Sequence, residues 1–126
     1  MRELSEKLGL GKQVHLLGYR KDIFEVCKAC DLFVFPSFRE GLSVALMEAM
    51  ACRLPVICSD IRGNTDLIED GKGGYLIDPT NTVKLSEKIT LLRSDYKLRE
   101  RFANYNKSSI NKYSVNNVTN KIIEIY

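Results

Sequence analysis

The sequence contains no long apolar run. Its uninterrupted hydrophobic stretches last only a few residues, whereas a membrane-spanning helix needs about 20. The segment from Met1 to Glu6 carries charges at Arg2 and Glu3 and lacks the apolar core of a secretory signal peptide. We therefore expect a cytoplasmic, globular chain. Of its 126 residues, 44% are hydrophobic, which is enough for the core of one domain.

Patterns for metal binding or nucleophilic catalysis are scarce. His15 is the only histidine, and no nucleophile pairs with it, so we expect a histidine without a chemical role. The spacing of Cys27 and Cys30 lies within a helical run, and no second pair or nearby histidine completes a zinc site. The other two cysteines are Cys52 and Cys58. Because nothing indicates secretion, we expect all four to be free thiols that pack as small hydrophobic side chains.

Positive charge is concentrated toward the C-terminus. Residues 1–80 contain 10 Lys or Arg and 12 Asp or Glu, whereas residues 81–126 contain 9 and 4. The basic residues are not interleaved with stacking aromatics, so we expect no nucleic-acid partner. The basic end fits either peripheral contact with an anionic membrane surface or an ordinary solvated helix face.

The stretch from Asp31 to Cys52 joins a strand, a tight loop and a helix. The apolar run at residues 32–35 is typical of a strand in a parallel sheet that is covered on both faces, and Pro36 ends it. Strong helix formers begin after Ser43, whose side chain is expected to cap the helix. The positive end of that helix then faces the loop at the carboxyl end of the strand, where open α/β sheets bind ligands, anions in particular.

Two acidic residues interrupt this arrangement. Glu40 lies in the loop and Glu48 in the helix, with seven residues between them. Glu48 shares a helix face with Val44 and Ala51, so we expect it to point inward and to require partners. The two carboxylates are expected to share one site, in which a nucleotide diphosphate places its ribose near Glu48 and its distal group near Glu40.

This stretch resembles the Glu-x7-Glu donor-binding motif of GT-B retaining glycosyltransferases, chiefly glycosyltransferase family 4 (glycosyl transferases group 1). The likeness continues through residues 49–57 and 70–77 and covers nearly the whole chain. Three positions depart from the family pattern. Ser43 and Arg53 stand where glycine is common, and Asp66 stands where glutamate is more usual. At Arg53 the turn is therefore expected to avoid the positive φ that glycine would supply.

The alternation of strands and helices predicts an α/β fold with a Rossmann-like parallel sheet of about four strands and flanking helices. Strands are expected at residues 13–17, 32–35, 55–58 and 75–77. Helices are expected at residues 2–10, 23–29, 43–52, 83–93, 96–106 and 115–125, with Asp22 and Thr82 as caps and a short helix, capped by Asn64 or Thr65, that runs to Glu69.

The resemblance implies a role for each residue of the motif. Glu40 is expected to hydrogen-bond hydroxyls of the donor sugar, and a nucleophilic role is the alternative. The backbone N–H groups of Gly41, Leu42 and Ser43 are expected to approach phosphate and sugar, and Glu48 to accept from ribose hydroxyls. Gly18, Tyr19 and Arg20 are expected beside the nucleotide base. No Asp-x-Asp element occurs, so no metal cofactor is implied.

By the same resemblance, residues 1–126 form a nucleotide-sugar-binding, GT-B C-terminal domain that lacks its first strands. An Arg/Lys pair that grips the donor pyrophosphate and an N-terminal domain that binds a glycan or lipid-linked acceptor are outside these residues. We therefore expect the donor-binding part of an enzyme of polysaccharide biosynthesis, inactive in isolation. The alternatives are a nucleotide-sugar-binding module without turnover, and a self-associating module that dimerises through an exposed sheet edge.

Overall fold

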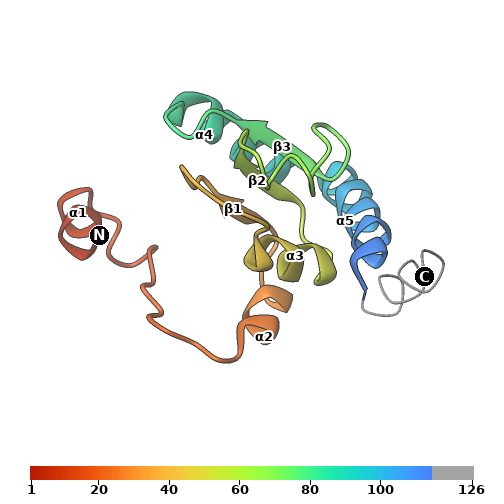
Figure 1. Cartoon of the computed structure of the whole chain (residues 1–126). Helices are drawn as coiled ribbons and strands as arrows, with labels where there is room; N and C mark the ends of the chain where they lie inside the picture. The colour runs from red at the N-terminus through yellow and green to blue at the C-terminus, as the bar shows by residue number, and fades with distance from the viewer. Residues whose placement is uncertain (115–126) are drawn as a thin grey trace.

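A computed structural model describes residues 1–114 of the chain. Helices and strands alternate along it (Figure 1). In chain order they are α1 (Arg2–Lys7), α2 (Ile23–Lys28), β1 (Phe33–Phe35), α3 (Val44–Ala51), β2 (Val56–Ser59), β3 (Gly74–Ile77), α4 (Thr82–Ser94), α5 (Tyr96–Ile110) and the 3-10 turn η1 (Asn111–Tyr113).

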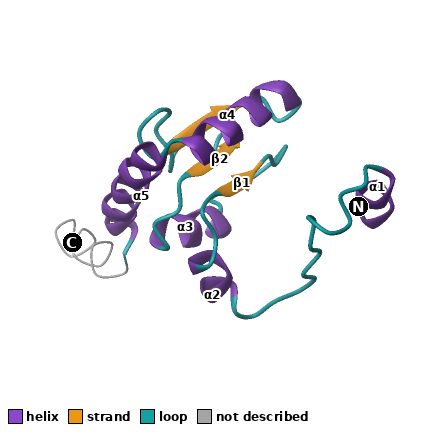
Figure 2. Ribbon diagram, turned by 180° about the vertical axis from the view of Figure 1, so that it is seen from behind, coloured by secondary structure: helices purple, strands orange, loops and turns teal. Residues whose placement is uncertain are grey.

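The three strands form one parallel sheet in the order β1-β2-β3. All four residues of the central strand β2 are buried, as the sequence predicts for a strand covered on both faces. Val56 and Cys58 pack on the side of α3, whereas Ile57 packs on the opposite face with Leu92 of α4 and Phe102 of α5. Helices therefore cover both faces of the sheet (Figures 1 and 2).

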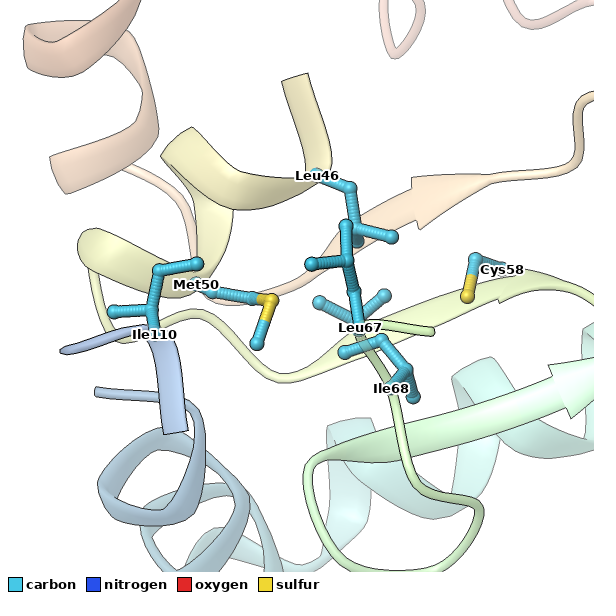
Figure 3. Packing of buried hydrophobic residues seen from close by; sticks show 7 residues of the cluster. Leu46, Met50, Cys58, Leu67, Ile68 and Ile110 are labelled. Atoms are coloured by element: carbon cyan, nitrogen blue, oxygen red, sulfur yellow. The ribbon is translucent and has the colours of Figure 1, made fainter. Parts of the chain in front are cut away.

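The larger core cluster joins α3 to the sheet, to the β2–β3 connection and to the end of α5. Figure 3 shows Leu46 and Met50 of α3 directed toward Leu67 and Ile68, with Ile110 closing one end. Four residues of this cluster are completely inaccessible to solvent: Leu46, Met50, Val56 and Cys58. Helix α3 and the connection after β2 are thus anchored to one packed core.

The structure has three strands within residues 1–114, not about four. Residues 13–17 form a loop that Figure 1 shows running apart from the sheet. A strand requires a neighbour to receive its backbone hydrogen bonds, and β1 pairs only with β2. Leu16 and Leu17 accordingly remain 46% and 55% exposed.

Several helix boundaries also differ from expectation. The segment before Glu69 forms turns rather than a short helix. Asn81, not Thr82, caps α4 by accepting from the Lys84 N–H. Helix α5 extends to Ile110 because that residue packs into the core beyond Asn106, where the helix was expected to end. The helix expected at residues 115–125 lies outside the described residues. In residues 1–114 no helix combines the length and apolarity needed to cross a bilayer.

The expected free thiols are confirmed for all four cysteines, but Cys30 is exposed instead of packing as a small hydrophobic side chain. Burial raises the pKa of Cys58 to about 12, from an ordinary value of 9.0. The folded state therefore holds this proton more tightly than the unfolded state, so the stabilisation is complete below about pH 9 and is lost as the pH rises toward 12. We expect wild-type protein to lose about 2 kcal/mol of unfolding free energy between pH 8 and 10.5 through this thiol alone.

Urea unfolding of wild type and Cys58→Val at the two pH values measures this loss as the difference between their pH slopes. The exposed Cys30 supplies the control variant Cys30→Val. Equal slopes in wild type and Cys58→Val would contradict the assignment.

Candidate functional site

The loop from Pro36 to Ser43 brings the candidate residues to the N-terminus of α3. Ser43 caps the helix as expected, because its Oγ accepts from the Leu46 N–H at 3.3 Å. No acidic side chain occupies the first turn, and within residues 1–114 no acceptor is found for the N–H groups of Gly41, Leu42 and Ser43. Free N–H groups and the positive end of the helix dipole together favour an anion at this position.

Glu40 is half-buried beside these N–H groups. The Ser37 hydroxyl donates to Glu40 Oε1 at 2.7 Å. This bond fixes the orientation of the carboxylate and leaves Oε2 free to accept from a hydroxyl of a ligand.

Glu48 does not point inward as the sequence suggested. The side of α3 that faces the core carries Leu46, Ala49 and Met50, whereas Glu48 is exposed on the opposite side with Val44. Glu48 lines a groove of about 390 Å³, whose other residues include Met47, Ala51, Lys107, Ile110 and Tyr113. A carboxylate in an open groove is accessible to a ligand, and its expected proximity to Glu40 remains a prediction.

The loop that carries Gly18, Tyr19 and Arg20 lies apart from α3 (Figures 1 and 2). Tyr19 is 90% exposed. Arg20 is paired with Asp22, to which its Nε donates at 2.8 Å. This hydrogen bond lowers the pKa of the Asp22 carboxyl group. Because its side chain is engaged by Arg20, Asp22 stands at the N-cap position of α2 but does not make the expected capping bond.

The loop after β2 is a neighbour of the site that the sequence did not reveal. The backbone of Gly63 lies against the carbonyl group of Gly41, in the loop that carries Glu40. Asn64 is completely buried, and its Nδ2 donates to the Ser59 carbonyl oxygen at 3.0 Å. It therefore closes this loop through its side chain instead of capping a helix. The sequence signals were a Gly-Asn pair and a position at the carboxyl end of a strand, both of which are weak indicators.

Comparison with known proteins agrees with the fold. Residues 1–109 match the family model described as glycosyl transferases group 1. The chain is 37% identical, over 113 residues, to the N,N'-diacetylbacillosaminyl-diphospho-undecaprenol alpha-1,3-N-acetylgalactosaminyltransferase of Campylobacter jejuni, a match covering 90% of this chain and 30% of that enzyme. The chain thus spans about 30% of the length of the curated relatives it matches.

Two solved structures are similar over nearly the whole chain. HepE from Anabaena in complex with UDP has a TM-score of 0.92 and 28% identity, covering 98% of this chain and 35% of that chain. The same protein is also known in complex with UDP-glucose. The C-terminal domain of the group 1 glycosyl transferase LpcC from Francisella tularensis has a TM-score of 0.79 and 28% identity, covering 90% of this chain and 60% of that chain.

Proposed function

The chain belongs to the glycosyl transferases group 1 family and shares the α/β fold of its GT-B members; from this premise we propose that it is the donor-binding part of a retaining glycosyltransferase of family 4. The enzyme would transfer a sugar from a nucleotide diphosphate sugar to a glycan or lipid-linked acceptor. One observation carries the proposal: three N–H groups without an acceptor in residues 1–114 stand at the N-terminus of α3, with Glu40 beside them.

In this proposal the N–H groups of Gly41, Leu42 and Ser43 bind the donor diphosphate. Negative charge develops on this group as the bond to the sugar breaks, and the helix dipole and N–H groups stabilise it. We propose that the helix dipole and the N–H groups stabilise this charge without a divalent metal, because the sequence has no Asp-x-Asp element. An Arg and a Lys outside these residues would also bind the diphosphate.

Glu40 would hold hydroxyls of the donor sugar. The bond from Ser37 leaves Glu40 Oε2 available as an acceptor, and a carboxylate forms strong, charge-assisted bonds with hydroxyl donors. Fixing the sugar in this way aligns its reacting carbon with the incoming acceptor. We assign Glu40 this positioning contact with the substrate rather than a covalent role.

Glu48 would accept hydrogen bonds from the ribose hydroxyls. It lies five residues beyond Ser43, or roughly 8 Å along the helix, and its exposure leaves both oxygens open to a ligand. Gly18 and Tyr19 would contact the base through backbone groups, together with Arg20. Since the structure holds this loop apart from α3, the assignment requires the loop to approach the helix when nucleotide binds.

The acceptor would bind to a part of the enzyme outside these residues. The name of the Campylobacter relative specifies a lipid-linked diphospho-undecaprenol substrate, which supports a lipid-linked acceptor, a role in polysaccharide biosynthesis and action at the cytoplasmic face of a membrane. The similar Francisella structure is that of a C-terminal domain, which supports the same assignment for this segment. We propose that the 126-residue chain alone binds donor without turnover.

Amide chemical shifts of the labelled chain test the proposal during titration with UDP, GDP and ADP. One nucleotide is expected to shift the amide resonances of residues 41–43 and 48 more than those of residues 65–70, which are part of a separate cavity lined by Thr65 and Lys112. Shifts confined to that second cavity, or none with any nucleotide, would contradict the proposal. Sugar transfer by the isolated chain would contradict only the expected lack of turnover.

A further inference from the structure

The backbone of Gly63 is packed directly against the loop that carries Glu40. Its φ of +97° lies in the left-handed region that favours glycine. A Cβ atom at this position would lie 2.0 Å from the Gly41 carbonyl oxygen and 3.0 Å from the Glu40 carbonyl oxygen. Carbon and oxygen atoms do not approach to 2.0 Å without a bond, so any side chain here would displace one of the two loops.

The loop that contains Gly63 is anchored in the core. Asn64 N–H donates to the Ile61 carbonyl oxygen at 3.1 Å, and the Asn64 carbonyl oxygen accepts from the Ile68 N–H at 2.8 Å. The side chain of Asn64 adds its bond to the Ser59 carbonyl oxygen. Leu67 and Ile68 then project into the cluster shown in Figure 3. These hydrogen bonds and core contacts fix the position of Gly63.

The Glu40 loop is held less firmly. Gly41 and Leu42 are exposed, and within the described part of the chain their N–H groups have no acceptor. When the two loops are forced apart, the loop with fewer fixed contacts moves. The displaced loop would therefore be residues 40–42, which carry the proposed contacts to the sugar and the diphosphate.

We propose that Gly63 is a positioning residue for the donor sugar. Because Gly63 has no side chain, the Glu40 loop packs directly against its backbone, and this contact fixes the position of Glu40 relative to the N-terminus of α3. This inference rests on the proposed function and assigns a role to a residue outside the Glu-x7-Glu motif. Gly63→Ala would push the Glu40 loop outward by about 1 Å. A displacement of this size lowers the reaction rate by up to about 100-fold when reacting groups must be aligned.

Gly71 provides a matched control. Its φ of +78° is also in the left-handed region, but a Cβ atom there would meet nothing within 4 Å. Gly71→Ala therefore introduces the same type of backbone strain without touching the Glu40 loop. In ligand-free protein, Gly63→Ala is expected to shift the amide resonances of residues 40–43, and Gly71→Ala is expected to leave them in place. Unshifted resonances in Gly63→Ala would overturn the inference.

Binding of UDP-glucose and of UDP then separates positioning from general damage. Gly63→Ala is expected to weaken UDP-glucose binding at least about 10-fold, because contacts to both the sugar and the diphosphate are disturbed. UDP binding is expected to weaken by a smaller factor of about 3-fold, because the buried Ser43 keeps its contact to the diphosphate. Gly71→Ala is expected to leave the binding of both ligands nearly unchanged. Equal weakening of both ligands by Gly63→Ala would overturn the specific link to the sugar. If wild type binds none of UDP, GDP and ADP, the proposed function fails, and the ligand-free amide shifts still decide whether Gly63 positions the loop.

A measurement on wild-type protein covers the case in which Gly63→Ala does not fold. The Gly63 Hα proton that points where a Cβ atom would stand lies beside the Gly41 carbonyl group, so we expect nuclear Overhauser effects from this proton to backbone protons of Gly41 or Leu42. Their presence supports the packing of Gly63 against the Glu40 loop, and their absence in well-resolved spectra overturns it without any variant.

Discussion

Replacing Asn106 with leucine is expected to remove roughly 2 to 4 kcal/mol of unfolding free energy. Asn106 is completely buried in α5. Its Nδ2 donates to the Leu54 carbonyl oxygen at 2.8 Å and to the Gly73 carbonyl oxygen at 2.7 Å. These residues precede β2 and β3, so one side chain ties α5 to the start of two strands. Leucine has a similar size but leaves the buried Leu54 carbonyl group without a donor, at about 1 to 3 kcal/mol. The Gly73 carbonyl group keeps only the longer bond from the Val56 N–H at 3.3 Å, and its lost bond adds about 1 kcal/mol.

Urea unfolding followed by circular dichroism measures the effect of Asn106→Leu. Asn104 is the matched control, since it lies two residues earlier on the same helix but is exposed, where it accepts from Arg53. Asn104→Leu is expected to change the unfolding free energy by less than about 1 kcal/mol. Similar losses in the two variants would show that the amide of Asn106 has no special role.

The sequence predicts the centre of the fold well because its signals there are local. A continuous apolar run, a proline that ends it and a serine before strong helix formers are all read from neighbouring residues. The structure confirms β1, the cap at Ser43 and α3 within a residue or two. The free cysteines and the buried strand β2 follow from composition in the same way.

The sequence fails where the outcome depends on distant partners. Residues 13–17 have the composition of a strand, but strand formation requires a neighbour, and within residues 1–114 none pairs with them. Asn106 has the sequence context of a surface residue in a polar helix. It is nevertheless buried, and its side chain bonds to two carbonyl groups that are distant in the sequence. Arg53 adopts φ +63° itself, contrary to the expectation that the turn would avoid this conformation.

The site divides along the same line. The loop from Glu40 to Ser43 follows from local pattern, and the structure brings these residues together at the helix N-terminus. The side of α3 that faces solvent depends on what packs against the helix, so the inward orientation predicted for Glu48 is wrong. The contact of Gly63 with the Glu40 loop joins segments from two different strand ends, and no periodicity in the sequence indicates it.

Glu48→Gln is expected to weaken UDP binding by about 1 to 3 kcal/mol, because the amide keeps the size of the side chain but loses the charge that strengthens its bonds to ribose hydroxyls. Glu87→Gln makes the same change on the exposed part of α4 and serves as the control. Titration with 2'-deoxy-UDP sharpens the test. Loss of the 2'-hydroxyl is expected to weaken binding to wild type and to have little further effect in Glu48→Gln. If Glu48→Gln binds UDP as tightly as wild type, Glu48 does not bind the ribose, and the groove it lines belongs to some other contact.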